Sequence, residues 1–296
     1  MLIMSLNFEE IWKLLRPKHW VKNVFILMPA IFAGSTISSV DYLRTVLGVV
    51  LFSILSSAVY IINDIIDLER DKEHPINRNR PIPSGKVKPV TAFILALVLL
   101  LIFIAFSRFL PFGFLYTGLS YFIINIFYSF LLKKLVLIDI FVISFGFVLR
   151  IISGIILIST PITHWIILPS FFLSLFLGFA KRREELILLG ESAEKAKEVL
   201  RHYDRQMLNS YLSITASLSI VFYALFTISD YAIAKYGTAN LIYTLPFVTY
   251  GFFRYYYLIS NRYGGKAPTE ILFLDLPIIF NVTLWALSVV LILNIG

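Results

Sequence analysis

The residues most suited to chemistry lie where an apolar segment gives way to polar residues, at positions 60–75. Four of them are Asn63, Asp64, Asp67 and Asp71. On a helix, positions 63, 67 and 71 follow one another at intervals of four and share one face, with position 64 beside them. Carboxylates packed this closely repel one another unless a cation neutralises them. Oxygen ligands beside a membrane favour Mg²⁺ that carries a phosphorylated substrate.

A second interpretation of this segment is a solvated, acidic helix end in which Arg70 and Lys72 alternate with the acids. Acids inside or beside a membrane segment usually have a functional role. The regular spacing therefore favours a metal site formed by the three aspartates. There Mg²⁺ would hold a diphosphate and neutralise the charge on a departing pyrophosphate.

Further polar residues of the same segment could bind the phosphates directly. The Asn63 amide can donate to a phosphate or orient a neighbouring acid. Arg78 and Arg80 follow the acids, and their forked donors match the geometry of a phosphate group. For each of these bases a purely topological role is equally open, so the set is more informative than any one member.

The chain is a membrane protein by composition, because 58% of its 296 residues are hydrophobic and only 15% are charged. About nine apolar runs reach the length of about 17–25 residues that a bilayer requires. They cover 21–36, 44–62, 89–107, 112–132, 136–158, 163–180, 209–229, 240–259 and 271–295. The sequence thus predicts an all-α, polytopic membrane protein, with about nine transmembrane helices around a central cavity and helical cap loops on the cytosolic side.

Basic residues are strongly segregated between the two sides of the membrane. The loops of one side hold 22 of the 26 Lys and Arg residues, whereas the other side has only Arg44, Arg108 and Lys235. The positive-inside rule therefore places the amino terminus and the acidic segment in the cytosol, and the chain in the cytoplasmic membrane. The net charge of +8 then reflects topology, and no nucleic-acid partner is expected.

No linker, repeat or low-complexity tract divides the sequence, so residues 1–296 are expected to form a single transmembrane domain. Within it, residues 1–20 form an amphipathic segment that is expected to lie along the membrane interface. The sequence has no cysteine and four His residues. Disulfides, thiolate metal sites and a cysteine nucleophile are therefore excluded, and a zinc site is not expected.

A second charged cluster begins where the sixth apolar run ends, and here cations come first. Lys181, Arg182 and Arg183 precede Glu184 and Glu185. Three consecutive cations cannot share one helix face, so two are expected to point to the polar site and one to lipid headgroups. The alternative is a stop-transfer cluster of solvated ion pairs.

Polar residues inside the predicted spans are costly to bury and should face the protein interior. Asp139 and Arg150 are eleven residues apart, so on one helix they lie within about 20° of each other and mark a cavity wall. Arg150 could bind a phosphate there, or could pair with Asn125 or another polar group, and the sequence leaves both interpretations open.

The polar segment resembles the UbiA superfamily of intramembrane prenyltransferases. The first signature of that family, Asn-Asp-x-x-Asp-x-x-x-Asp, is matched fully at positions 63–71, and Arg80-Pro81-x-x-Ser84-Gly85 follows. Together with the count of spans, the resemblance covers nearly the whole chain. It implies an all-helical bundle with a central cavity that opens sideways to lipid, cytosolic caps and dependence on Mg²⁺.

The second aspartate-rich signature of the family, normally found after the sixth span, is absent here. Lys181, Arg182 and Glu185 stand in its place. With Arg16-Pro17-x-x-Trp20-Val21-Lys22-Asn23, these residues resemble the decaprenyl-phosphate phosphoribosyltransferase branch of the family. This resemblance implies that phosphoribosyl pyrophosphate is the donor and a polyprenyl phosphate lipid the acceptor.

The resemblance also implies roles for individual residues. Mg²⁺ and the leaving pyrophosphate are assigned to Asp64, Asp67 and Asp71, with Asn63 assisting. Substrate contacts are assigned to Lys22, Arg78, Arg80, Arg150, Lys181, Arg182 and Glu185, of which Glu185 is expected at ribose hydroxyls and Arg150 at the lipid phosphate.

Two alternatives to phosphoribosyl transfer remain open at this stage. One is a UbiA-type enzyme that transfers a prenyl group from a prenyl diphosphate to an aromatic or glycerol-phosphate acceptor, against which the missing second signature argues. The other is a transporter of polar solutes, for which no inverted repeat is visible. The membrane is a partner in each case, and a homo-oligomer is compatible with all three.

Overall fold

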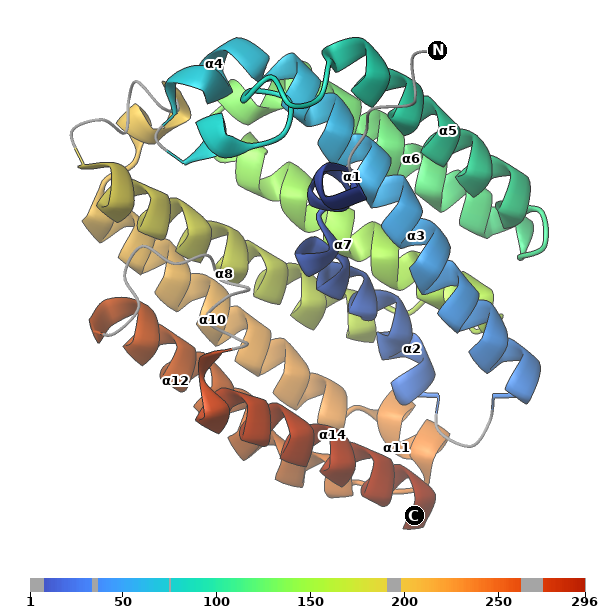
Figure 1. Ribbon diagram of the computed structural model, residues 1–296. Coiled ribbons are helices and arrows are strands. Elements are labelled where there is room, and N and C mark those ends of the chain that lie inside the picture. The colour runs from blue at the N-terminus through green and yellow to red at the C-terminus, as the bar shows by residue number, and fades with distance from the viewer. Residues whose placement is uncertain (1–7, 34–36, 75, 191–197, 262–273, 296) are drawn as a thin grey trace. The chain divides into compact units, whose positions relative to one another are not determined.

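The computed structural model describes the chain except for residues 1–7, 34–36, 75, 191–197, 262–273 and 296. Every regular element of the described part is a helix, and seven of the helices are long and apolar enough to cross a membrane (Figure 1). The expectation of an all-α, polytopic membrane protein is confirmed. The chain divides into two compact units, which are described in turn. The central cavity and the single domain stay predictions.

The first unit comprises Met1–Met28, Ser39–Val142 and Leu149–Thr160. Its helices are α1 (Phe8–Leu15), the 3₁₀ helix η1 (Pro17–Leu27), α3 (Ser39–Ile66), α4 (Leu68–Glu73), η3 (Asn77–Asn79), α5 (Pro89–Ser107), α6 (Phe112–Phe130), η4 (Leu132–Lys134) and most of α7 (Ile138–Leu157).

The second unit comprises Pro29–Ser38, Ile143–Val148 and Pro161–Gly296. Its helices are most of α2 (Met28–Ile31), α8 (His164–Leu189), η6 (Glu198–His202), α10 (Arg205–Thr227), α11 (Asp230–Tyr236), η7 (Asn240–Thr244), α12 (Leu245–Asn261) and α14 (Leu276–Ile295).

Seven of the nine predicted spans correspond to long single helices, and two are built differently. The described part of span 21–36 consists mainly of η1 and the short α2, with Pro29 inside α2. Span 240–259 consists of η7 followed by α12, a helix of 17 residues. The helix α8 continues beyond residue 180 to Leu189, so the second charged cluster lies within the same helix as the sixth span.

The core of the first unit forms where α3 packs against α5 and α6. The rings of Phe52, Phe103 and Phe114 are fully buried there, and the centroid of Phe114 lies 6.4 Å from that of Phe52 and 5.8 Å from that of Phe103. On the side of α5 that faces α3, the small residues Ala92 and Ala96 are buried. Small side chains let the two helix backbones approach closely, as in other membrane helix pairs.

The outer face of α5 is apolar and exposed, as a lipid-facing helix requires. Phe93, Leu97 and Leu101 are each between 47% and 56% exposed. Exposure of such a continuous apolar surface to water would cost much free energy. Contact with lipid chains avoids this cost.

Polar bonds hold the non-α segment η1 against α3. The indole Nε1 of Trp20 donates to Oγ of Ser57 at 3.0 Å, and Nδ2 of Asn23 donates to Oγ of Ser53 at 2.9 Å. The chain enters η1 through Arg16, whose φ of 52° and ψ of 58° are left-handed. Side-chain hydrogen bonds thus fix the position of a segment that lacks a regular α-helical backbone.

In the second unit, the most extensive contact is between α8 and α10. The rings of Phe172 and Phe222 stack there, with centroids 5.3 Å apart and planes inclined by 3°. The hydroxyl of Ser219 donates to the carbonyl oxygen of Pro169 at 3.0 Å. Aromatic stacking and a polar bond therefore hold these helices side by side (Figure 1).

Gly118 of α6 gives a test of the packing in the first unit. A Cβ at this position would overlap the fully buried ring of Phe103. We expect Gly118→Ala to lower the free energy of unfolding by about 1–3 kcal/mol, as overpacking of a core does. Thermal unfolding in detergent measures the loss. The control is Gly251→Ala, whose Cβ would meet only Nδ2 of Asn281, at 3.4 Å; equal stability of the two variants would contradict this packing.

Candidate functional site

The acidic segment lies where α3 ends and α4 begins. Asn63 and Asp64 belong to the last turn of α3, Asp67 stands between the helices with φ −88° and ψ 6°, and Asp71 belongs to α4. The predicted continuous helix is therefore broken at Asp67. The backbone N–H groups of Asp67 and Asp71 still donate to the carbonyl oxygens four residues earlier, at 2.9 and 2.8 Å.

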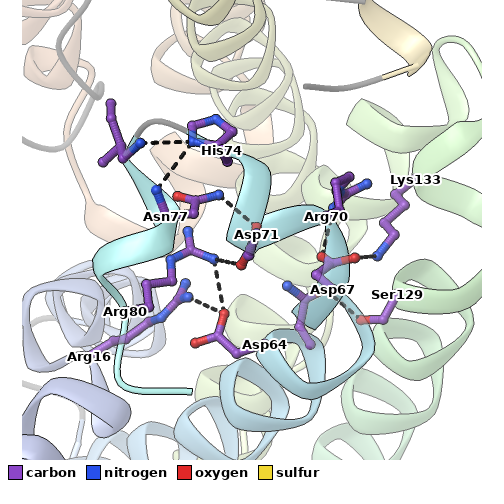
Figure 2. Close-up of polar contacts among 12 residues, drawn as sticks. Arg16, Asp64, Asp67, Arg70, Asp71, His74, Asn77, Arg80, Ser129 and Lys133 are labelled. Atoms are coloured by element: carbon purple, nitrogen blue, oxygen red, sulfur yellow. Dashed lines mark hydrogen bonds and ion pairs between the residues drawn. The ribbon is translucent and has the colours of Figure 1, made fainter. Parts of the chain in front are cut away.

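The carboxylates of Asp64 and Asp71 converge on one side of this segment. Nη1 of Arg80 donates both to Oδ1 of Asp64, at 3.0 Å, and to Oδ2 of Asp71, at 2.6 Å (Figure 2). Seven residues turn a helix by about 700°, which is within about 20° of two full turns. Residues 64 and 71 consequently share a face more closely than residues 63, 67 and 71, which were expected to do so.

Asp64 is the most buried of the three aspartates, at 1% exposure. Its Oδ1 accepts a second bond, from Nη2 of Arg16 at 2.5 Å. Within the described part of the chain, no protein group bonds to its other oxygen, Oδ2. Oδ1 of Asp71 accepts from Nδ2 of Asn77 at 2.8 Å, so the amide of Asn77 holds Asp71 independently of the arginines.

Asp67 points to a different set of partners. Its Oδ1 accepts from Nζ of Lys133 at 2.5 Å, and its Oδ2 from Nη2 of Arg70 at 2.8 Å (Figure 2). Lys133 follows α6, and on the same helix the hydroxyl of Ser129 donates to Oδ1 of Asn63 at 2.9 Å. The end of α6 therefore fixes both Asn63 and Asp67.

We name these groups the rim cluster, defined as Asp64, Asp67, Asp71, Arg16, Arg70, Arg80 and Lys133. Each of its three carboxylates forms an ion pair with at least one of its four cations. Because there are four cations and three carboxylates, the cluster carries one excess positive charge. Burial lowers the pKa of the Arg80 guanidinium, and repulsion by Arg16 lowers it further. Burial also lowers the pKa of the Lys133 amine, while its bond to Asp67 acts in the opposite direction. The protein's own bases thus supply the neutralising charge that was expected from a metal.

The donor atoms of the rim cluster suit a hard divalent cation. Mg²⁺ prefers one or two carboxylates together with water and phosphate oxygens over a closed protein cage. Asp64 and Asp71 offer two buried carboxylates that converge on one point. In the present arrangement, no three acidic or histidine side chains of the described residues are grouped closely enough to enclose a metal. The residues therefore fit a site that the substrate's own oxygens complete.

Three further predicted site residues also lie in the first unit: Arg78, Lys22 and Arg150. Arg78 is exposed in η3, and Lys22 is partly buried in η1. Arg16 and Arg150 both lie close enough to oppose the positive charge of Lys22. A phosphate bound beside Lys22 would relieve this repulsion.

Arg150 is 3% exposed, and Asp139 on the same helix is fully buried, as expected of an interior face. Nε of Arg150 donates to Oδ1 of Asn23 at 2.8 Å, and its Nη2 donates to the hydroxyl of Tyr121 at 3.1 Å. Its guanidinium also lies 5.2 Å from the ring centroid of Phe52. These contacts favour the interpretation in which Arg150 pairs with polar groups, and the amide is that of Asn23.

The second charged cluster lies in the last turns of α8, within the second unit. Nη1 of Arg182 donates to Oε2 of Glu185 at 2.6 Å, and Nζ of Lys181 lies 3.8 Å from Oε1 of Glu185. Arg182 is 2% exposed, whereas Lys181 is exposed. The structure thus brings these three predicted residues together. The expected cap beyond α8 falls partly on residues 191–197, which lie outside the described part.

Arg183 has a structural role that the sequence did not reveal. Its Nε donates to Oδ1 of Asn209 on α10 at 2.7 Å, and its Nη1 to the carbonyl oxygen of Ile259 on α12 at 3.1 Å. Arg183 therefore ties three helices together. Of the three consecutive cations, Arg182 and Arg183 are buried and Lys181 is exposed. The expected division between a polar site and lipid headgroups stays a prediction.

Five residues that contact the predicted acids and Asn63 were not predicted as site residues: Arg16, Arg70, Asn77, Ser129 and Lys133. Arg16 belongs to the Arg-Pro pair that opens the amino-terminal motif, and that position was a usable signal. Lys133 lies 66 residues from Asp67, so no local spacing connects the two residues.

Comparison with known proteins identifies one family from the sequence and finds the same fold in solved structures. The model of the UbiA prenyltransferase family matches residues 23–276. A decaprenyl-phosphate phosphoribosyltransferase of Corynebacterium glutamicum is 32% identical over 271 residues, which cover 89% of this chain and 80% of that protein. The protein of the same name from Mycolicibacterium smegmatis is 31% identical over 73% of this chain and 70% of its own.

The structure of a UbiA homolog from Archaeoglobus fulgidus bound to DMAPP and Mg²⁺ matches with a TM-score of 0.71, at 17% identity, over 97% of this chain and 100% of that chain. A structure of a UbiA homolog from the same organism bound to GPP and Mg²⁺ gives a TM-score of 0.72. At this identity the likeness concerns the fold, whereas the family model rests on the sequence itself. The resemblance drawn from the aspartate signature is confirmed: the chain belongs to the UbiA prenyltransferase family.

Proposed function

We propose that the protein transfers 5-phosphoribose from phosphoribosyl pyrophosphate to a polyprenyl, decaprenyl-like phosphate in a Mg²⁺-dependent reaction that releases pyrophosphate. The observation that carries the proposal is the cationic cluster of Lys181 and Arg182, joined by Glu185, at the place of the family's second aspartate signature. The donor and the lipid together bring a diphosphate and two further phosphates, so additional cations suit them better than additional acids. The names of the two relatives support the same reaction.

The rim cluster is the proposed binding site for the diphosphate of the donor. Asp64 and Asp71 would hold Mg²⁺ from one side, and Asp67 would contribute from the end of α6. Bound there, Mg²⁺ would stabilise the negative charge of the departing pyrophosphate. Arg80 would donate to the diphosphate oxygens, with Arg78 nearby at the surface.

The second charged cluster and η1 would bind the remaining phosphates. Lys181 and Arg182 would hold a donor phosphate, with Glu185 at the ribose hydroxyls. On η1, Lys22 would face the lipid phosphate. The printed hydrogen bonds of Arg150 go to Asn23 and Tyr121 and not to the aspartates of the rim cluster. We therefore assign Arg150 to holding Asn23, and through it η1, in place.

The reaction needs no strong general base. An anionic oxygen of the lipid phosphate attacks the anomeric carbon of the ribose, a new C–O bond forms, and the C–O bond to pyrophosphate breaks with its electron pair. Because the attacking oxygen carries no proton near neutral pH, the task of the protein is to align the two substrates and to stabilise the leaving group. We propose that this occurs at the cytosolic face of the cytoplasmic membrane, where the basic residues are concentrated.

A reconstituted assay tests the reaction. Purified protein is incubated with Mg²⁺, labelled phosphoribosyl pyrophosphate and a polyprenyl phosphate, and we expect the label to enter the lipid fraction. The UbiA homolog structures with DMAPP and GPP make prenyl transfer the second candidate. Consumption of a prenyl diphosphate, with no label in the lipid, would replace the first candidate by the second.

Replacement of Asp64 by Asn should reduce turnover by about a hundredfold or more, because the amide removes one charged oxygen ligand from the proposed metal site. The rate of label transfer at saturating substrates measures the effect. Asp41→Asn is the matched control, since Asp41 begins the same helix and pairs with Arg44 at 3.3 Å. Turnover of Asp64→Asn equal to that of the control would remove Asp64 from the site.

Replacement of Lys181 by Ala should raise the KM for phosphoribosyl pyrophosphate by about tenfold with little change in kcat, because one charge-assisted contact to phosphate is worth about 1.5 kcal/mol or more. Steady-state kinetics at varied donor concentration measure the change. Lys235→Ala removes a cation from α11 and serves as the control. An unchanged KM would support the stop-transfer interpretation of the second cluster.

A further inference from the structure

Arg80 occupies the position that a divalent cation shared by Asp64 and Asp71 would need. A single atom, Nη1, lies 3.0 Å from Oδ1 of Asp64 and 2.6 Å from Oδ2 of Asp71 (Figure 2). These two carboxylates are 1% and 2% exposed. A metal and this guanidinium nitrogen cannot both occupy one point between the same oxygens, because their like charges would lie within contact distance in a poorly solvated place.

The charges of the rim cluster disfavour a free metal ion. With four cations around three carboxylates, the cluster is already positive by one charge. A lone divalent ion would add two more positive charges without an anion to balance them. A diphosphate that arrives with the metal brings three or four negative charges, at about neutral pH, and reverses this balance.

The contacts also indicate which arginine can leave. Every bond of Arg80 to another side chain of the described chain goes to Asp64 or Asp71, and its side chain is 30% exposed. Arg16 is more enclosed, at 17% side-chain exposure, and its guanidinium also lies 5.3 Å from the ring centroid of Tyr60. When Arg80 moves away, Asn77 still holds Asp71 and Arg16 still holds Asp64.

We propose that Arg80 is a built-in counter-ion that excludes free divalent metal from the rim cluster, so that the metal enters only together with a diphosphate. In the same step Arg80 exchanges its two carboxylates for the oxygens of the diphosphate. Arg80 therefore selects the metal–diphosphate complex over its separate components. This inference rests on the metal site of the proposed function but not on the identity of the donor, since any organic diphosphate would act in this way.

Binding of Mn²⁺ as a substitute for Mg²⁺, measured by electron paramagnetic resonance on the purified protein without turnover, tests the exchange. The probes are Mn²⁺ alone and Mn²⁺ with inorganic pyrophosphate. We expect the unmodified protein to bind free Mn²⁺ weakly and to bind it at least about tenfold more tightly with pyrophosphate. Arg80→Ala should bind free Mn²⁺ about tenfold more tightly than the unmodified protein, and its response to pyrophosphate should be smaller.

The control is Lys72→Ala, which removes a cation of the same segment that pairs with the exposed Glu69 at 2.7 Å. It should bind Mn²⁺ as the unmodified protein does. Arg80→Gln, which keeps hydrogen-bond donors but loses the charge, should behave like Arg80→Ala and replaces it if that variant fails to fold.

The outcomes separate this inference from the proposed function. Equal affinity for free Mn²⁺ in Arg80→Ala, Arg80→Gln and the unmodified protein overturns the exchange but leaves the metal site intact. If none of the proteins binds Mn²⁺ even with pyrophosphate, the metal site itself is wrong and the exchange fails with it. Loss of the pyrophosphate-dependent binding in Asp64→Asn, together with tighter free binding in both Arg80 variants, is the result that supports the proposal.

Discussion

The balance of charge around Asp64 is the constraint on which the rest of the site depends. A carboxylate that is almost completely buried at the end of a membrane helix is stable only with a positive partner. Arg16 and Arg80 provide it from two distant parts of the chain. The positions of η1, which begins beside Arg16, and of the turn after α4, which carries Arg80, are therefore linked to one carboxylate oxygen.

The membrane imposes a second constraint, which explains why polar bonds recur along α3. Ser53 and Ser57 accept hydrogen bonds from η1, and Arg150 donates to Asn23 from α7. In a membrane, no hydrophobic driving force brings helices together, because lipid chains are as apolar as the side chains. Hydrogen bonds in the interior can therefore decide where an irregular segment lies, and here they hold the segment that carries Lys22 and adjoins Arg16.

Much of the fold could be predicted because apolar length is a strong signal. Seven predicted spans correspond to long helices, and the aspartate signature lies at the end of one of them. The first span was predicted less well, because apolar content does not distinguish the 3₁₀ helix η1 from an α-helix. The sequence also did not show that α8 continues without a break through Lys181 to Leu189, since a charged cluster marks the end of an apolar run but not the end of the helix.

The acids of the site could be read from the sequence, whereas their partners could not. Arg16 lies 48 residues from Asp64, and Lys133 lies 66 residues from Asp67. These pairs depend on tertiary packing, which a local motif does not encode. The spacing of the acids groups residues 63, 67 and 71 on one helix face, whereas in the structure Arg80 joins the carboxylates of Asp64 and Asp71.

The backbone of Arg16 and its ion pair together limit which amino acids can replace this residue. Its φ of 52° is one that glycine adopts freely and that a residue with a Cβ adopts at a cost of about 1–2 kcal/mol. Glycine would relax the main chain but would leave Oδ1 of Asp64 with one guanidinium instead of two. Lysine would retain the charge but not the planar fork. The local conformation thus favours glycine, whereas the ion pair requires arginine. A search for stabilising mutations guided by backbone preference alone would therefore select the wrong residue here.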